Sequence, residues 1–513
     1  MPVGPEPGSE RYSLWEPGFA ERRQVLRTPG FPFEAHPSGE GGISLRLRIA
    51  ALSVVSVLVG AVMPIPSAPA LAEALRPPPN IVVILTDDQR WDTLRYMPNV
   101  RRLLANRGMT FTNSFVSNSL CCPARVSLLT GNYSHTTGVY TNTLPDGGWK
   151  RFHRNGQETS TMATWLNDAG YRTAMIGKYM NGYGPGNRFV PPGWDRWAAF
   201  EPNSGLYYDY KMNIDGRFVR FDHDRRDYST DVLARLSTRT VRRTPPDQPL
   251  FLYMAPFAPH GPFTPAARDV GTGPGGPPSW PRNFDEKAIR DKPRYLWSQK
   301  RFSHTKEAAR WNTMVESLQA VDDAVRELVQ ALDRTGRLHN TLFVFTSDNG
   351  LSFGEHRWGY KLVPYEESIR VPLVVRWDGV IAPGSVDGHL ALNIDLATTL
   401  GEVAGAPTPA TDGRSLVPLL THTASSWRAS FLLEHEWYQR RHKSNPPTYC
   451  GVRTRTRVFI RYASGFREYY NLRRDPYQLR NSARVPTAAQ RVQRLENLTR
   501  NLCQPRPPGM PGF

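Results

Sequence analysis

Residues 80–88 read NIVVILTDD, a run of β-branched and other apolar residues that stops at two adjacent carboxylates. An apolar run of this length is typical of a strand buried on both faces, as in a parallel sheet. Residues 342–350, LFVFTSDNG, have the same arrangement and stop at Asp348, Asn349 and Gly350. Each stretch therefore predicts a buried strand with oxygen-bearing side chains at its carboxyl end.

Three further strands are predicted, over 172–176, 250–255 and 371–376. The first runs into Gly177-Lys178, and the second is followed by a proline-punctuated loop that carries His260. A long helix is predicted over 307–333, where apolar residues recur at spacings of three and four. Strands alternating with helices indicate an α/β fold, with a large, mostly parallel sheet flanked by helices on both faces.

Ligands of such sheets bind outside the carboxyl ends of the strands. We therefore expect the two acidic pairs, Lys178 and His260 to meet at one rim. A single charged residue after a strand more often just begins a loop. Two acidic pairs, each directly after a buried strand, favour a site instead.

After about residue 425 the pattern changes. Short strands are predicted over 431–434, 457–461 and 468–472, and a terminal helix over 488–501. This pattern indicates a smaller antiparallel sheet. We expect a main domain over 78–424 and a small C-terminal α+β subdomain over 425–513.

The N-terminal region has the layout of an export signal. The uncharged apolar run 49–63 follows Arg46 and Arg48 and is followed by Ala70-Leu71-Ala72. Fifteen residues are short for a membrane span, so an uncleaved anchor is the minority alternative. We predict a leader of uncertain role over 1–48, a signal peptide core and cleavage region over 49–72, and a secreted, periplasmic or cell-surface protein. Contact with a membrane is expected only if the apolar segment is uncleaved.

Composition narrows the function classes. With 39% hydrophobic and 21% charged residues, the 513-residue chain is neither a multispanning membrane protein nor disordered in bulk. The net charge of +18 suits an acidic partner such as a sulfated polymer, a membrane surface or a nucleic acid. An arginine-favouring codon preference explains it as well, because only nine of the 64 basic residues are Lys. Since no nucleic-acid-binding module is recognisable, we expect no nucleic-acid partner.

The four cysteines fall into two pairs. Cys450 and Cys503 are both C-terminal, and a disulfide between them would suit an exported chain. Cys121 and Cys122 are adjacent, which is the spacing of neither a redox motif nor a zinc site.

Residues 120–131, LCCPARVSLLTG, are the stretch with the most residues that suggest a functional site. Pro123 is suited to open a short helix and Gly131 to cap its end. Cys121 then lies at a helix N-terminus, where free N–H groups favour an anion. Arg125, one turn further, adds a donor fork for a sulfate or phosphate. The alternative is a loop with buried thiols and a surface arginine.

This motif resembles the C-x-P-x-R…TG signature of the type I, formylglycine-dependent sulfatases. Within that family the N-acetylglucosamine-6-sulfatases and arylsulfatases are most similar. The resemblance spans most of the chain, and its other segments, in order, are Asp87-Asp88-Gln89, GKYMNGYG (177–184), PPGWDRW (191–197), Pro259-His260, SDNG (347–350), GEH (354–356) with Lys361, and DGRSL (412–416). It implies an alkaline-phosphatase-like sandwich.

The resemblance also implies a mechanism. Cys121 would be oxidised to formylglycine by a formylglycine-generating enzyme, and one hydroxyl of its hydrate would attack sulfur while the second later expels sulfate. One calcium ion would be held by a set of oxygen ligands. That set is Asp87, Asp88, formylglycine 121, Asp348 and Asn349.

The remaining catalytic roles also follow from the resemblance. Arg125 would stabilise the hydrate, and Lys178 and Lys361 would hold the sulfate. His260 would protonate the leaving oxygen. The implied reaction is hydrolysis of sulfate monoesters in a sulfated sugar or glycan. The expected position is the 6-O-sulfate of N-acetylglucosamine or glucosamine.

One position departs from the family pattern. Many sulfatases have a histidine where this chain has Met180, and Asn181 is a candidate substitute. His135 and His356 are either pocket residues or structural loop histidines. The aromatic residues of 194–210 either stack on sugar rings or belong to the core.

Three other functions stay open. A broad-specificity arylsulfatase would share all these residues. A phosphonate monoester or phosphodiester hydrolase of the same superfamily usually has additional metal-binding histidines beside the second acidic pair. A non-catalytic sulfoglycan-binding protein would have lost its nucleophile or a metal ligand, and this sequence retains both.

Overall fold

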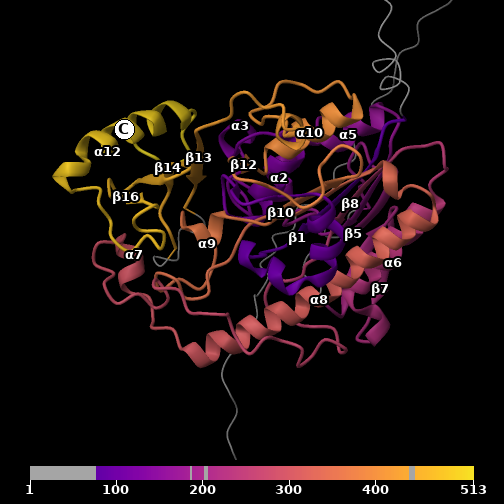
Figure 1. The fold of residues 1–513 in the computed structure, drawn as a ribbon, viewed down its shortest axis with the longest axis horizontal. Helices are drawn as coiled ribbons and strands as arrows, with labels where there is room; N and C mark the ends of the chain where they lie inside the picture. Colours follow the sequence, from indigo (N-terminus) through magenta and orange to yellow (C-terminus); the bar gives the residue numbers. More distant parts are fainter. Residues whose placement is uncertain (1–76, 185–187, 202–205, 438–444, 513) are drawn as a thin grey trace, which may run out of the picture. The chain divides into compact units, whose positions relative to one another are not determined.

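Strand β1 (Asn80–Thr86) lies inside a ten-stranded sheet of the computed structural model (Figure 1). It pairs in parallel with β8 (Leu250–Ala255) on one side and β9 (Thr341–Ser347) on the other. All three strands are buried along their whole length, as their apolar sequences predict. The structure describes residues 77–184, 188–201, 206–437 and 445–512, so the predicted leader (1–48) and signal segment (49–72) lie outside the described residues.

The large sheet has the order β11-β2-β10-β9-β1-β8-β4-β5-β6-β7. Its centre from β9 to β5 is parallel, whereas β10 and the β5–β6–β7 meander pair antiparallel. The predicted α/β fold with a mostly parallel sheet is therefore confirmed, with antiparallel flanks. The remaining strands are β11 (Ser385–Asp387), β2 (Met109–Phe111), β10 (Leu373–Trp377), β4 (Arg172–Gly177), β5 (Arg196–Phe200), β6 (Tyr210–Ile214) and β7 (Arg217–Phe221), with β3 (Ser114–Phe115) and β12 (Ala391–Leu392) forming a separate pair.

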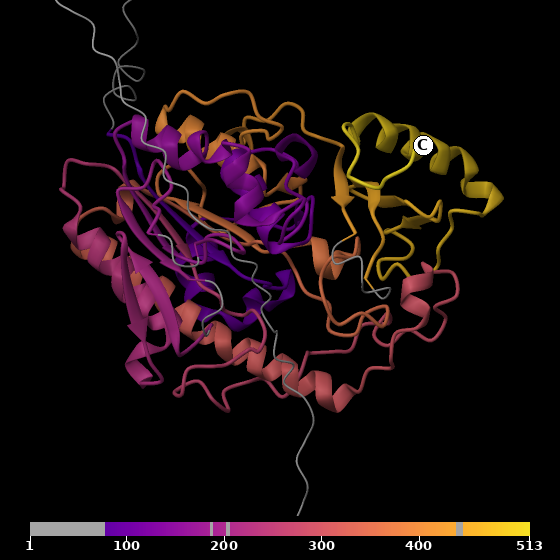
Figure 2. The same cartoon turned by 180° about the vertical axis from the view of Figure 1, so that it is seen from behind.

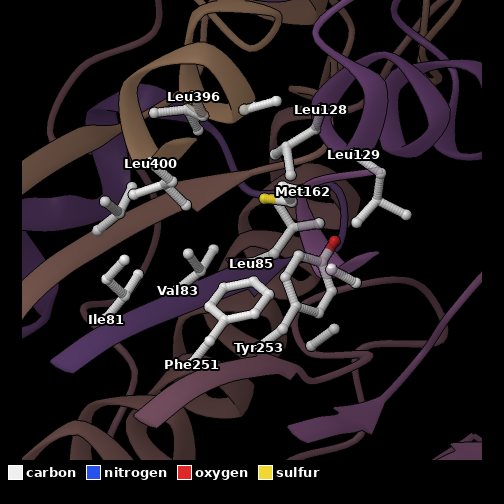
Figure 3. Close-up of a cluster of buried hydrophobic side chains, with 14 of the residues drawn as sticks. Ile81, Val83, Leu85, Leu128, Leu129, Met162, Phe251, Tyr253, Leu396 and Leu400 are labelled. Atoms are coloured by element: carbon white, nitrogen blue, oxygen red, sulfur yellow. The ribbon is translucent and has the colours of Figure 1, made fainter. Parts of the chain in front are cut away.

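Helices cover both faces of this sheet (Figures 1 and 2). Alternate residues of β1, such as Val83, pack with α2 (Cys121–Thr130), α5 (Met162–Asp168) and α10 (Asp395–Ala404), as Figure 3 shows. The intervening residues, such as Val82, pack against α6 (Ser229–Arg243) and α8 (His304–Arg334). Helix α8 contains the predicted 307–333 helix. The shorter helices are α3 (Ser134–Thr137), α4 (Gly148–Arg154), α7 (Arg294–Trp297), α9 (Glu366–Ile369) and α11 (Val417–Leu420).

A smaller antiparallel sheet follows, as predicted. Its strands are β13 (Ser430–His435), β14 (Tyr449–Thr454), β15 (Arg457–Tyr462) and β16 (Arg467–Asn471), and helix α12 (Ala489–Leu502) packs on β14 and β15. Cys450 and Cys503 form the predicted disulfide. The antiparallel sheet and the larger domain contribute to one hydrophobic cluster, in which the rings of Phe115 and Phe431 lie 5.1 Å apart.

No helix among the described residues is long and apolar enough to cross a membrane.

Candidate active site

The ends of β1 and β9 bring the two acidic pairs together. The backbone N–H of Asp88 donates to Oδ1 of Asp348 at 3.1 Å, and Nδ2 of Asn349 donates to Oδ1 of Asp88 at 2.7 Å. Asp88 adopts φ +65°, so the chain turns sharply where β1 ends. The rim that the strand pattern predicts therefore exists, and these side chains are buried in it.

Cys121 lies at the first residue of α2, the predicted N-terminal position, and Gly131 caps that helix in the left-handed conformation (φ +73°). The helix begins at Cys121, two residues before the proline that was expected to open it. The Sγ atom of Cys121 is 3.5 Å from Oδ1 of Asp87. The side chain of Asn142 accepts the N–H of Cys122 at 2.9 Å and so fixes the start of the helix.

Arg125 is fully buried and joins three parts of the site. Its Nε atom donates to Oδ2 of Asp348 at 2.8 Å, and its Nη1 atom donates to the carbonyl of Lys178 at 2.8 Å. Its Nη2 atom lies 3.9 Å from Oδ2 of Asp87 and has no hydrogen-bond partner. The surface-arginine alternative is therefore wrong.

Two lysines face the carboxylates of β1. The Nζ atom of Lys178 is 2.5 Å from Oδ2 of Asp87. Lys178 follows Gly177, where a Cβ atom would lie 2.1 Å from the carbonyl oxygen of Ala255, so β4 and β8 approach closely enough there to require glycine. The Nζ atom of Lys361 is 2.5 Å from Oδ1 of Asp88 and 2.7 Å from Sγ of Cys121.

His260 stands at the open side of the cluster, with its side chain 29% exposed. Its Nδ1 atom lies 2.6 Å from the carbonyl oxygen of Gly261 and must carry hydrogen there, because a carbonyl only accepts. Its Nε2 atom is 3.7 Å from Oδ2 of Asp88. The Tyr207 hydroxyl donates to the His260 carbonyl at 2.5 Å and helps to position the loop.

Three carboxylates, of Asp87, Asp88 and Asp348, face the three cations Arg125, Lys178 and Lys361. Burial alone would raise the pKa of Asp87, but Lys178, His260 and Arg125 lower it to about 2. Burial raises the pKa of the Cys121 thiol to about 12, against the opposing effect of the two lysines. Unmodified Cys121 is therefore protonated and a poor nucleophile at neutral pH.

The oxygen donors of the cluster suit a hard divalent cation. Asp87, Asp88, Cys121 and His260 each offer one ligand atom, and these atoms lie within 4.8 Å of one another, but only the two carboxylates are ligands of the kind that calcium prefers, because thiol and imidazole suit zinc better. The Oδ1 atom of Asn349 is buried without a hydrogen-bond partner, although its Nδ2 atom is bonded. A bound cation would satisfy this oxygen, since amide and carboxylate oxygens are the ligands of calcium and magnesium.

The other candidate residues lie in different surroundings. Met180 is buried in the main core, and the Oδ1 atom of Asn181 is buried without a hydrogen-bond partner. His135 contacts Glu434 at 3.1 Å. His356 contacts Glu286 at 2.6 Å and stacks on a tyrosine, which favours the structural interpretation for both histidines. The aromatic side chains Trp194, Trp197, Tyr207 and Tyr210 belong to the core.

Sequence reasoning missed one supporting residue, Asn142, because no local pattern marks its bond to the start of α2. It singled out Tyr207 only as one of the aromatic residues of 194–210 and not for its bond to the His260 loop.

Two family models match this chain. The model described as Sulfatase covers residues 79–406, and the one described as N-sulphoglucosamine sulphohydrolase, C-terminal, covers residues 354–504.

Curated relatives agree with these matches. Human N-acetylglucosamine-6-sulfatase is 33% identical over 79% of this chain and 81% of its own length. The extracellular sulfatase SULF-1 homolog of Drosophila melanogaster is 36% identical over 69% of this chain, but the match spans only 33% of that protein.

Solved structures share the fold. A protein whose structure was solved in complex with its substrate D-glucosamine-2-N,6-O-disulfate superposes with a TM-score of 0.73 at 24% identity, over 83% of this chain and 98% of that one. The phosphonate monoester hydrolase of Agrobacterium radiobacter superposes with a TM-score of 0.67 at 20% identity, over 83% and 95% of the two chains. At these identities the likeness concerns the fold alone.

Proposed function

Because the chain belongs to the sulfatase family of sulfuric ester hydrolases, we propose that it hydrolyses sulfate monoesters at the cluster around Cys121. The observation that carries this proposal is the position of Cys121, which lies within contact distance of Asp87 and Lys361 at the rim where four strands end. A buried thiol with a pKa near 12 has no obvious use there as a thiol. Its conversion to formylglycine would supply a hydrated aldehyde whose hydroxyl attacks sulfur.

The surrounding residues divide the remaining work. Arg125, held by Asp348, stabilises and orients the group at position 121. Lys178 and Lys361 offset the charge that develops on the sulfate oxygens as the S–O bond to the sugar breaks. The leaving sugar oxygen takes a proton from Nε2 of His260, whose Nδ1–H is fixed on the Gly261 carbonyl. Sulfate is then bonded to the hydrate at position 121, and loss of the proton of the second hydroxyl expels it and restores the aldehyde. Water adds to the aldehyde again and so supplies the oxygen and protons that complete the hydrolysis.

We propose calcium as the resident metal ion. Asp87, Asp88, Asp348, Asn349 and the modified residue 121 would hold it, which would give the unpartnered Oδ1 atom of Asn349 a ligand role. Of these residues, Asp87, Asp88 and Cys121 have ligand atoms within 4.8 Å of one another. When bound, the ion draws electron density from a sulfate oxygen and from the group at position 121.

For the substrate we propose the 6-O-sulfate of N-acetylglucosamine or glucosamine in sulfated glycans. The support comes from relatives, since the human, goat and Bacteroides thetaiotaomicron proteins are named N-acetylglucosamine-6-sulfatases or 6-O-sulfatases. A broad arylsulfatase is the alternative within the class, and the Chlamydomonas reinhardtii relative is named an arylsulfatase.

A phosphonate monoester hydrolase is the second candidate activity, because such an enzyme shares the fold. Turnover of an aryl sulfate against an aryl phosphonate separates the two. We expect the sulfate to react at least about 100-fold faster in kcat/KM, a difference of about 2.7 kcal/mol. The reverse ranking would favour the phosphorus ester.

We further propose that the protein is exported, that 78–424 is its catalytic domain, and that 425–513 is an α+β subdomain. Two curated relatives are named extracellular sulfatases, and the Cys450–Cys503 disulfide suits an oxidising compartment. A formylglycine-generating enzyme is the expected partner during maturation.

The deciding experiment has two parts. The mass of the peptide that contains Cys121 is measured on protein from its own host, and turnover is measured on glucosamine 6-sulfate and related sulfated sugars. We expect an aldehyde at position 121, turnover of the 6-sulfate, and neither in Cys121→Ala. An unmodified thiol in calcium-bound protein would contradict catalysis and favour a non-catalytic sulfoglycan-binding protein.

A further inference from the structure

The positive charge of the chain is concentrated in its C-terminal part. Residues 425–513 contain seventeen Lys and Arg but five Asp and Glu, a net charge of +12 out of +18 for the chain. The catalytic cluster uses none of these residues. Catalysis therefore does not explain the positive charge of this region, which comprises β13–β16 and α12 (Figure 1).

A cavity of about 740 Å³ is lined by five arginines of this subdomain and reaches Asn113 of the larger domain. Arg455 and Arg457 come from the β14–β15 turn and the start of β15, and Arg473 follows β16. Arg491 and Arg494 lie one turn apart on α12 and so point to the same side of the helix. Of the twelve lining residues, the others are small or polar apart from two leucines of α12, and no acid is among them.

These arginines differ from their neighbours on the same sheet. Arg453 pairs with Glu366, and Arg461 and Arg467 pair with Glu496 on the other side of α12. Within the described ranges, none of the five cavity arginines has a carboxylate within ion-pairing distance. The Nε atom of Arg457 is buried without a hydrogen-bond partner. An anion entering the cavity would meet several charge-assisted donors at once.

We propose that this cavity is a second, non-catalytic site that binds a sulfated stretch of a polysaccharide. The guanidinium fork matches the oxygens of a sulfate group, and neighbouring sulfates along one chain can engage arginines of the turn and of α12 together. Among the described residues that line the cavity none is aromatic, which disfavours a nucleic acid, because single strands bind by stacking their bases. The choice of a glycan rests in part on the proposed function, whereas the anion site rests on the cavity alone.

The experiment measures binding of a short heparin oligosaccharide by calorimetry, using full-length protein with Arg455→Gln, Arg491→Gln and Arg494→Gln combined. The matched control combines Arg101→Gln, Arg102→Gln and Arg107→Gln, three exposed arginines of the helical turns Val100–Leu104 and Ala105–Arg107, and loses the same charge. We expect the cavity variant to bind at least about tenfold more weakly, since it loses several charge-assisted contacts, and the control to change less than about twofold. Turnover of a monosaccharide sulfate should stay at the wild-type value in both.

Equal losses in both variants would overturn the proposal in favour of bulk charge, and so would unchanged binding in both. Equal affinity of wild-type protein for a single-stranded DNA oligonucleotide, lost in the cavity variant, would overturn the glycan assignment. If the triple variant fails to fold, Arg491→Gln with Arg494→Gln suffices, because glutamine is well tolerated in an exposed helix. Failure of the proposed function gives a different result. Wild-type protein would then turn over no sulfate ester, while the cavity variant would still bind the heparin oligosaccharide more weakly than wild type.

Discussion

The Nζ atom of Lys361 lies 2.7 Å from the Sγ atom of Cys121, although 240 positions separate the two residues in the chain. The same ammonium group lies 2.5 Å from Oδ1 of Asp88. Burial alone would lower the pKa of Lys361, but Asp88 and Cys121 raise it well above the ordinary value for lysine. The group is therefore a fixed positive charge beside the candidate nucleophile.

Replacing this charge tests its role in the reaction. We expect Lys361→Met to lower kcat by about 10²–10³-fold, because the charge that develops on the sulfate loses a preorganised partner. Steady-state kinetics with a small sulfate ester give kcat and KM separately. The control is Lys306→Met at an exposed position of α8, which should leave both constants unchanged. A Lys361→Met protein that is folded and fully active would contradict the assignment.

Asn349 supplies a test of the metal site that needs no turnover. Calcium at about 100 times its dissociation constant should stabilise wild-type protein by about 2.7 kcal/mol, and EDTA should reverse this. In Asn349→Ala we expect most of the calcium-dependent rise in Tm to disappear, because one ligand oxygen is lost. Asn393→Ala is the matched control, since Asn393 is also buried with an unpartnered Oδ1 atom but donates to Ala124. Equal calcium responses in the two variants would remove Asn349 from the ligand set.

Gly177 connects the fold to the position of Lys178. In Gly177→Ala the new Cβ atom would overlap the Ala255 carbonyl, so we expect a loss of about 2–4 kcal/mol in unfolding free energy and a reduced kcat. Gly170→Ala is the control, because Gly170 also has positive φ but nothing within 4 Å of the added Cβ atom. Its expected cost is only about 1–2 kcal/mol, with kcat unchanged. Denaturant unfolding and kinetics measure both quantities, and equal effects on kcat would refute the proposed link.

Because His435 is buried in the C-terminal sheet, we expect the free energy of unfolding to fall at acidic pH. Burial lowers its pKa to about 3, whereas the unfolded chain has the ordinary value of 6.5. Between these values the unfolded state binds the additional proton, so stability is full above pH 6.5 and falls as the pH drops below it.

The loss from this one group should reach roughly 2 kcal/mol at pH 5. His435→Leu should flatten the pH dependence of unfolding by that amount. Denaturant unfolding at a series of pH values measures the slopes, and identical slopes for wild type and His435→Leu would disprove the effect.

The central strands could be predicted because burial on both faces requires continuous apolar runs, and β1 and β8 have the predicted bounds. The strands at and near the two edges could not. Strand β7 is almost entirely exposed, and β2 and β11 have only three residues each, so neither of these two has a period long enough to recognise.

The same contrast holds at the site. The general rule for strand ends predicted that the acidic pairs, Lys178 and His260 share one rim, and the family resemblance added Lys361. The bond from Arg125 to the Lys178 carbonyl depends on the relative placement of α2 and β4, which no local pattern encodes.

The parallel pairing of β1 with β9 joins residues about 260 positions apart, and that of β1 with β8 joins residues 170 apart. Pairing over such separations is slow, because the entropy of closing long loops is lost before the contacts compensate for it. A chain that has formed only its helices and hairpins thus contains all the reactive groups but no site. The activity of a preparation should therefore rise with the closure of the central sheet, and should report the fraction of chains that have completed this late event.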